Sequence, residues 1–277
     1  MSAEKSKGLR FLYHTAPGRV ILKIAASRGV SKMCGRFLDS ALSKRLIPGF
    51  IEKNGIDMSD YEDCTYSCFN EFFYRQIKHD KRPVSHDPED FISPSDGLLS
   101  AYRIGEGTVI PVKQSTYTIS GLLGGDPVSD VYRDGICLVF RLCVDNYHRY
   151  CYIDDGEKGD NRFIPGVLHT VRPIALEAEP VFIENCREFT VMDTENFGRV
   201  TQIEVGAMLV GKIKNHDGKG RIKKGAEKGR FEYGGSTIIV LLGKDRVRVP
   251  EKLFTNTANG IETRVRMGQT IGKKIMK

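Results

Sequence analysis

The sequence predicts an α+β fold that is mainly β, with an antiparallel sandwich-like or barrel-like body preceded by amphipathic helices. Before about residue 80, apolar side chains recur at the three-to-four-residue spacing of helices. From residue 98 onward the chain changes to short apolar runs between Gly, Asp and Asn turns, which is typical of strands. The composition, 40% hydrophobic and 28% charged over 277 residues, is that of a soluble globular protein able to bury a core.

Positive charge is concentrated at the N-terminus. Residues 1–53 contain 11 Lys/Arg and 3 Asp/Glu, whereas the remaining 224 residues contain 31 and 32. Such a segment is typical of nucleic-acid binding, of binding to an anionic membrane surface, or of a solvated face. Nucleic acid is disfavoured because aromatic side chains are not interleaved with Lys and Arg as a stacking platform.

The first 60 residues predict amphipathic helices with Lys and Arg opposite their apolar faces. The apolar faces are Val20, Ile21, Ile24 and Ala25, then Met33, Phe37, Leu38, Ala41 and Leu42. No apolar run approaches the roughly 18 residues that a spanning helix needs, and Met1 is not followed by a signal-peptide core. We expect residues 1–60 either to pack on the body as a helical pair or to bind an anionic membrane through the apolar face.

The body is expected to begin with a helix over residues 61–78, because Phe69, Phe72, Phe73 and Ile77 form one core-facing stripe. The run Ser93-Pro-Ser-Asp96-Gly97 predicts a turn. The strand-like runs are 108–112, 136–144, 148–153, 167–174, 188–192, 199–205, 208–213 and 237–242. No long helix is expected after about residue 130, and nothing separates a second domain cleanly.

Metal and nucleotide sites are not expected. Seven cysteines without a repeating spacing indicate a reducing compartment rather than a disulfide scaffold. Cys64 and Cys68 lack a second pair that would complete four zinc ligands. The Gly- and Lys-rich run 211–220 does not have phosphate-loop spacing, and no G-x-G-x-x-G follows a strand.

The run Gly234-Gly235-Ser236-Thr237 stands directly before the last predicted strand. Two glycines permit a positive φ and a close approach of the backbone to a neighbouring group. The simplest interpretation is a turn entering a strand. The alternative is that the Ser236 hydroxyl attacks the Gly235 carbonyl, an N→O acyl shift that opens self-cleavage between the two residues.

Five motifs in order, from residue 69 to the C-terminus, resemble those of the phosphatidylserine decarboxylase family. They are Phe69-Asn-Glu-Phe-Phe-Tyr-Arg75, Ser93-Pro-Ser-Asp-Gly97, Lys113-Gln-Ser-Thr-Tyr117 with Leu122-Leu123, Asn146-Tyr-His-Arg149, and Lys224-Gly-x-Glu-x-Gly-x-Phe-x-x-Gly-Gly-Ser-Thr237. Each motif is weak alone, but five in the family's order make a chance match implausible.

The resemblance implies a self-cleaving enzyme whose cofactor is a pyruvoyl group made from Ser236. Cleavage between Gly235 and Ser236 would give a β chain of residues 1–235 and an α chain of residues 236–277, held together as a heterodimer, with a higher oligomer left open. The pyruvoyl carbonyl would form a Schiff base with phosphatidylserine and accept the electrons released as CO₂ leaves, giving phosphatidylethanolamine. Residues 61–277 would be the catalytic domain, and the protein would be peripheral on the cytoplasmic face of the cell membrane.

The resemblance also assigns the catalytic side chains. Asp96 takes the position of the carboxylate that orients a base, and His148 is expected to protonate the substrate carbon after CO₂ loss. The family's relay histidine is expected at the position held here by Cys151. We hypothesise that His169 replaces it, because the runs before and after 154–166 would form an antiparallel hairpin with paired Cβ atoms roughly 5 Å apart.

Two alternative functions remain at this stage. A pyruvoyl-dependent amino-acid decarboxylase would use the same chemistry, but a soluble substrate does not require the basic amphipathic N-terminus. A non-catalytic binding module is suggested by residues 205–213 and 262–272, which resemble the two halves of a lipoyl-type sandwich. No convincing modifiable Lys flanked by Met stands at a hairpin tip.

Overall fold

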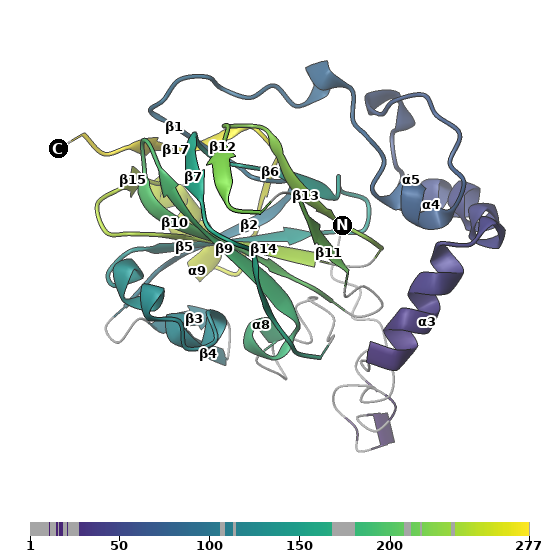
Figure 1. The fold of residues 1–277 in the computed structure, drawn as a ribbon, viewed down its shortest axis with the longest axis horizontal. Coiled ribbons are helices and arrows are strands. Elements are labelled where there is room, and N and C mark those ends of the chain that lie inside the picture. The colour runs from purple at the N-terminus through teal and green to yellow at the C-terminus, as the bar shows by residue number, and fades with distance from the viewer. Residues whose placement is uncertain are drawn as a thin grey trace.

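A computed structural model describes residues 11, 15, 17–18, 21, 28–105, 109–112, 115–167, 181–207, 212–216, 218–233 and 236–276. Some predictions fall outside the described residues. They concern most of the first predicted helical face, residues 113–114 of the third motif, residues 168–180 with His169, residues 208–211 of the predicted run 208–213, and Gly234-Gly235. The described chain is mainly β, and its sheets are antiparallel, as the sequence predicts. Figure 1 shows the helices of the N-terminal region at one side of the sheets.

The N-terminal region is a series of short helices. They are α3 (Arg28–Leu38), the 3-10 helix η1 (Ala41–Leu46), α4 (Ile47–Asn54), η2 (Met58–Asp60) and α5 (Phe69–Phe73). Pro48 stands in the first turn of α4, where its missing N–H costs nothing, and Gly55 ends the helix at φ 59°. The predicted helix over residues 61–78 is therefore wrong in length. Its core-facing stripe is confirmed, since Phe69, Phe72 and Phe73 are buried.

The body is organised around an open nine-stranded antiparallel sheet. Its order is β12-β7-β9-β10-β14-β5-β2-β16, with β8 also paired to β9. The strands are β2 (Gly97–Arg103), β5 (Ile136–Leu142), β7 (Gly156–Lys158), β8 (Arg162–Ile164), β9 (Arg187–Thr194), β10 (Gly198–Val205), β12 (Gly220–Ile222), β14 (Ser236–Leu242) and β16 (Thr263–Val265). The central strands coincide with the predicted runs 136–144, 188–192, 199–205 and 237–242.

Strand β14 separates two hydrophobic cores. Successive strand side chains point to opposite faces, and here Ile239 and Leu241 join one cluster whereas Ile238, Val240 and Leu242 join the other. The first cluster is closed by β4 (Ser115–Thr118), α6 (Ile119–Leu122) and α8 (Val181–Glu184). Every residue of β14 is buried, which explains why its sequence is a continuous apolar run after Thr237.

A three-stranded sheet covers the second cluster. It consists of β11 (Ile213–Asn215), β13 (Glu227–Phe231) and β6 (Arg149–Cys151), in that order. Another three-stranded sheet, β1 (Asp90–Ile92), β17 (Thr270–Lys274) and β15 (Val247–Arg248), closes the same side. The remaining described elements are β3 (Val109–Val112), which pairs with β4, and three helices: η3 (His79–Lys81), η5 (Pro127–Tyr132) and α9 (Glu251–Ala258). The sequence did not predict α9.

The predicted hairpin between the runs before and after 154–166 stays a prediction, because the second run, 167–174, lies outside the described residues except for Val167. Strand β6 pairs with β13, whereas β7 and β8 both pair with β9. Within the stretch between the two runs, β7 and β8 pair with one edge of β9, whose other edge pairs with β10. Hydrophobic patterns fix which face of a strand is buried but not which partner pairs with it.

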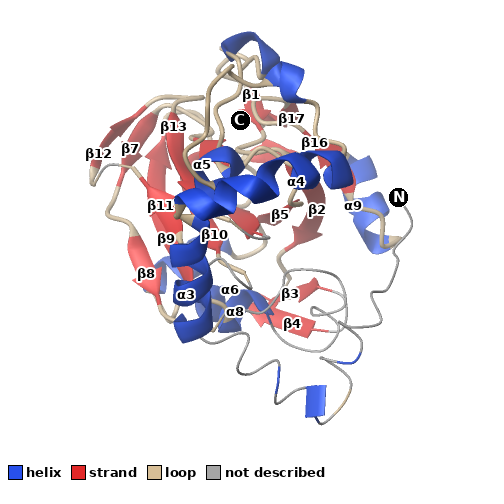
Figure 2. Ribbon diagram, turned by 90° about the vertical axis from the view of Figure 1, so that its right-hand side faces the viewer, coloured by secondary structure: helices blue, strands red, loops and turns tan. Residues whose placement is uncertain are grey.

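The N-terminal helices share a core with the body. Leu38, Ile47, Phe69, Phe72 and Phe73 are buried in one cluster that also contains Tyr147, with Tyr233 and Met267 packed against it. Figure 2 shows α4 and α5 lying across the sheets from this side. The helical region therefore covers the two segments that lead to His148 and to Ser236.

Candidate active site

Strand register brings three distant parts of the chain to one end of the nine-stranded sheet. Ser236, the first residue of β14, is paired with Leu142, the last residue of β5. Leu98 is paired with Arg141, so Asp96, just before β2, also lies at this end. Val205 at the end of β10 is paired with Thr237. The turn containing Asp96, the segment after β5 that carries His148, and Ser236 therefore gather at this end.

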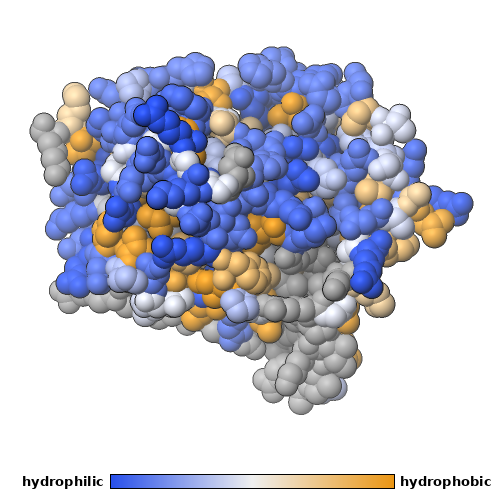
Figure 3. Space-filling model, viewed as in Figure 1, coloured by the Kyte–Doolittle hydropathy of each residue, from blue (hydrophilic) through white to orange (hydrophobic). Residues whose placement is uncertain are grey.

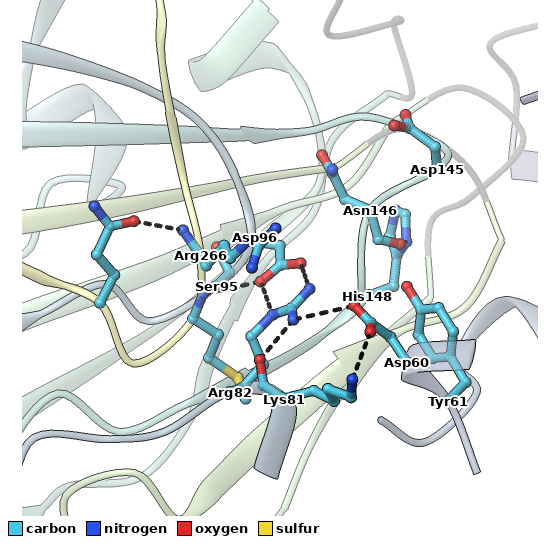
Figure 4. A network of polar contacts seen from close by, with 12 residues as sticks. Asp60, Tyr61, Lys81, Arg82, Ser95, Asp96, Asp145, Asn146, His148 and Arg266 are labelled. Carbon is cyan, nitrogen blue, oxygen red and sulfur yellow. Dashed lines mark hydrogen bonds and ion pairs between the residues drawn. The ribbon is translucent and has the colours of Figure 1, made fainter. Parts of the chain in front are cut away.

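Asp96 is buried and held by three hydrogen bonds (Figure 4). Its Oδ1 accepts from Arg82 Nε at 2.8 Å and from the Met267 backbone N–H at 2.9 Å, and its Oδ2 accepts from Arg82 Nη2 at 2.6 Å. Each carboxylate oxygen can accept two hydrogen bonds. Within the described contacts, Oδ2 keeps one acceptor position, which is what a carboxylate needs to orient a histidine.

Arg82 is the partner that sequence analysis missed. Its side chain is only 8% exposed, and its Nη1 lies 3.8 Å from an Asp60 carboxylate oxygen, so it stands between Asp60 and Asp96. The fork of the guanidinium matches a carboxylate in two parallel hydrogen bonds and fixes its plane. No local pattern in the sequence indicates this pairing.

His148 is fully buried and neutral. Its Nδ1 lies 2.8 Å from the backbone carbonyl of Asn146, which can only accept, so Nδ1 carries the proton and Nε2 carries the lone pair. Burial, followed by the nearby charge of Arg75, lowers the pKa of His148 to about 3. Within the described residues Nε2 has no hydrogen-bond partner. A buried nitrogen without a partner is unusual in a folded protein, which makes Nε2 a candidate for proton transfer.

Cys151 cannot serve as a base at neutral pH. The side chain is buried, and burial raises the pKa of the Cys151 thiol to about 12, so the thiol stays protonated. Its sulfur lies 4.0 Å from the carbonyl of Ser93, beside the turn that carries Asp96. Cys151 therefore acts as a small buried side chain at the position where the family resemblance expects a histidine.

Ser236 combines complete burial with an unpaired hydroxyl. Within the described residues neither Ser236 Oγ nor Thr237 Oγ1 has a hydrogen-bond partner. Because Ser236 stands two residues before Ile238, it faces the side of the sheet that β6 and β13 cover. The neighbouring Gly235 lies outside the described residues.

The segment that leads to Ser236 is held by the helical region. The Asn70 side chain accepts from the backbone N–H of Tyr233 at 3.1 Å, and the rings of Phe69 and Phe73 lie 5.0 Å from the Tyr233 ring. Phe73 also packs against the His148 ring at 4.0 Å. Helix α5 thus contacts both His148 and the approach to Ser236, and it fixes one relative to the other.

A buried ion pair anchors β13 to the central sheet. Lys228 Nζ lies 2.8 Å and 2.9 Å from the two carboxylate oxygens of Glu204, and both side chains are fully buried. Asn215 donates to Glu204 and accepts from Lys228. Burial lowers the pKa of Lys228 and raises the pKa of Glu204. This pair fixes the strand that immediately precedes the Tyr233–Ser236 segment.

Three features bear on cofactors and membranes. In the part of the chain that the structure describes, no three His, Cys, Asp or Glu side chains are grouped to hold a metal ion. All seven cysteines are free, with Cys64 exposed and Cys68 buried. No helix among the described residues is long and apolar enough to cross a membrane.

Comparison with known proteins gives a consistent result. The family model for phosphatidylserine decarboxylase matches residues 69–273. The chain is 45% identical over 270 residues to phosphatidylserine decarboxylase proenzyme 2 of Clostridium acetobutylicum, covering 97% of this chain and 92% of the relative. It is 39% identical over 275 residues to the phosphatidylserine decarboxylase proenzyme of Ruminiclostridium cellulolyticum, with 97% and 92% covered. It is 37% identical over 276 residues to that of Clostridium botulinum, with 98% and 93% covered.

Proposed function

The chain belongs to the phosphatidylserine decarboxylase family, and on that premise we propose that it converts phosphatidylserine to phosphatidylethanolamine and CO₂ after cleaving itself. The observation that carries the proposal is the match of the family model over residues 69–273, which contain the predicted cleavage run. The pyruvoyl-dependent amino-acid decarboxylase and the lipoyl-like module have no comparable support.

Ser236 is the proposed nucleophile of self-cleavage and the precursor of the cofactor. Its Oγ attacks the Gly235 carbonyl carbon, the hydroxyl proton passes to a base, and the peptide C–N bond breaks as the nitrogen takes up a proton. Loss of the Cα proton of the resulting ester expels the carboxylate that ends the chain of residues 1–235. Hydrolysis then releases ammonia and leaves a pyruvoyl group at the start of the chain of residues 236–277.

The residues present fit such a group. The Ser236 hydroxyl is buried without a hydrogen-bond partner among the described residues, and conversion to a pyruvoyl group would remove this unsatisfied hydroxyl. When present, the pyruvoyl group supplies an electron sink for the electrons released as CO₂ leaves. The buried, largely apolar surroundings lower the local dielectric and so strengthen the electrostatic interactions of the polar groups around such a group.

Asp96 and His169 are the proposed orienting carboxylate and base for Ser236. Asp96 has one free acceptor position on Oδ2, within the described contacts, for an imidazole N–H. Support for His169 comes from Val167, which exchanges backbone hydrogen bonds with the turn at Glu184 and Cys186. Cys186 in turn accepts from Gly206, next to Val205 at the end of the sheet that holds Thr237. The chain therefore approaches the proposed site two residues before His169.

His148 is proposed to move the proton that reaches the substrate carbon. Because Nδ1–H is fixed on the Asn146 carbonyl, Nε2 is the atom that accepts and releases this proton. Its pKa of about 3 keeps the resting imidazole neutral, so His148 must take up a proton during turnover before donating it. The packing of Phe73 against the ring holds Nε2 in one direction.

The helices α3 and η1, within residues 1–60, are proposed to bind the anionic cytoplasmic face of the membrane. Four apolar side chains there are about half or more exposed: Met33, Phe37, Leu42 and Leu46. Arg36, Lys44 and Arg45 are exposed among them, and hydrophobic and hydrophilic side chains lie together at the right-hand edge of Figure 3. An apolar face edged with cations suits an interfacial helix on anionic lipid.

One assay tests the function. Purified wild-type protein and Ser236→Ala should be compared on phosphatidylserine in mixed micelles and on free serine, with release of labelled CO₂ measured. We expect release from phosphatidylserine by the wild type alone. Turnover of free serine at a comparable kcat/KM would instead assign the protein to the amino-acid decarboxylases.

A further inference from the structure

An open cavity of about 360 Å³ lies beside Asp96, within the roughly 300–1,000 Å³ range of small-ligand pockets. Three parts of the chain line it: the stretch from Ile77 to His86, the segment around β6, and the turn from Lys224 to Glu227. Met267 completes the lining. This volume is sufficient for a phospholipid headgroup but not for acyl chains as well.

The cavity lining carries an excess of positive charge. Its cations are Lys78, Arg82, Arg149 and Lys224, with the imidazoles of His79 and His86. The single carboxylate of the lining, Glu227, already pairs with Arg149 at 2.9 Å and with His216 at 2.6 Å. Arg82 is likewise neutralised by Asp96.

Two of the cations have no carboxylate partner within the described residues. Lys78 Nζ donates to the Ser59 carbonyl at 3.0 Å, and Lys224 Nζ donates to the carbonyls of Asp87 and Asp90 at 2.7 Å. Neither ammonium forms an ion pair with a described carboxylate. The Lys224 ammonium nevertheless lies in the field of the Asp87, Asp90, Asp154 and Asp155 carboxylates. Lys78 is therefore the cation of the lining that is best placed to attract an anion into this concave surface.

The cavity adjoins the catalytic groups directly. Arg82 lines it and also binds Asp96, Met267 lines it and donates its N–H to Asp96, and Tyr147 precedes His148. In phosphatidylserine the phosphate is separated from the reacting amine by only the serine carbons and one ester oxygen. A phosphate held in the cavity would therefore keep the amine of the same headgroup close to the wall formed by Arg82 and Met267, which both bind Asp96.

We infer that this cavity binds the phosphate group of the substrate headgroup, with Lys78 and His79 as contacts at its rim. The inference rests on the proposed function for the identity of the headgroup. Free phosphate offers the same chemistry to these cations, so the two sources must be separated by experiment.

The test uses the double variant Lys78→Gln/His79→Gln and a matched control, Lys244→Gln, which removes a cation that pairs with Asp134 outside the cavity. We expect the KM for phosphatidylserine to rise about tenfold in the double variant, equivalent to about 1.4 kcal/mol. The kcat and the fraction of self-cleaved protein should stay within about twofold of the wild type, since neither residue contacts the reacting atoms. The control should match the wild type in all three quantities.

Calorimetric titration provides a second readout that needs no turnover. Glycerophosphoserine should bind wild-type protein more tightly than inorganic phosphate, and both should weaken about tenfold in the double variant. Unchanged KM and unchanged titrations would overturn the phosphate site. Equal affinity for the two probes would overturn its assignment to the headgroup. A third outcome separates the two claims: the wild type neither cleaves itself nor releases CO₂, but it binds phosphate and the double variant does not. In that case the proposed function would be refuted and the phosphate site would stand.

Discussion

Replacing Arg82 by Gln should remove the partner that holds Asp96. Both side chains are less than 10% exposed, and two hydrogen bonds of 2.6 Å and 2.8 Å join them. Breaking a buried ion pair by removing one member costs about 3–5 kcal/mol, because an uncompensated charge stays buried. We expect that loss of unfolding free energy in urea titrations, together with self-cleavage slowed at least about tenfold by loss of a general-base network. Self-cleavage is measured on denaturing gels after cell-free synthesis.

A matched control and a second substitution separate orientation from folding. Arg103→Gln removes an arginine whose partner, Glu251, is 70% exposed, so it should cost at most about 1 kcal/mol. Adding Asp96→Asn to Arg82→Gln removes the buried charge, and stability should recover while self-cleavage stays slow. If Arg82→Gln cleaved at the wild-type rate, or if the double variant recovered cleavage with stability, the assignment of Arg82 as the positioning partner of Asp96 would be refuted.

Three further predictions concern other parts of the molecule. The pKa of His148 is about 3 in the folded chain and about 6.5 in the unfolded chain, so the unfolded chain binds more protons below pH 6.5 and the protein loses stability as the pH is lowered. Between pH 7 and pH 4.5, the free energy of unfolding of His148→Asn should therefore fall by about 2–3 kcal/mol less than that of the wild type. Equal losses in urea titrations would argue against a buried neutral imidazole. Lys228→Met should cost about 3–5 kcal/mol, and adding Glu204→Gln should restore part of it; equal stability of the single and double variants would exclude the uncompensated charge as the cause. Phe37→Ser should weaken cosedimentation with anionic vesicles about tenfold at an unchanged melting temperature, as expected for loss of one exposed aromatic anchor. Unchanged cosedimentation would refute the proposal that α3 contacts the membrane.

The main strands could be predicted from sequence because their side chains carry the information locally. The run 136–144 alternates apolar and polar residues at its ends, and the structure places β5 at Ile136–Leu142. The run 237–242 is apolar on both faces because two cores enclose β14. Helix α9 was missed because its apolar side chains are few and none of its residues is buried.

The positioning residues could not be predicted, since their partners are distant in sequence. Asn70 binds the backbone of Tyr233 across 163 positions, and no local motif announces such a contact. Arg82 and Asp96 are 14 positions apart, on either side of β1, and the pairing depends on the loop between them. The pairing of β6 with β13 was not predicted for the same reason, since the two strands are distant in sequence.

The motifs predict which residues react, and the structure adds the protonation state of one of them, His148. The motif placed His148 in the site, but only the Asn146 carbonyl beside Nδ1 shows that Nε2 carries the lone pair. In the same way, Cys151 was an exception to the family pattern, and its burial shows that the thiol is not a substitute base. His169 remains the proposed base, and His169→Ala should abolish or strongly slow self-cleavage.

Intact-mass measurement of the purified protein tests the central claim most directly. The account predicts two chains that end and begin at the Gly235–Ser236 bond, the smaller one resistant to N-terminal sequencing and reactive toward a hydrazine because it begins with a carbonyl. Ser236→Ala should give one uncleaved chain. A wild-type protein that stays a single chain of 31.0 kDa, or a smaller chain with a free amino terminus, would contradict the claim that Ser236 becomes the cofactor.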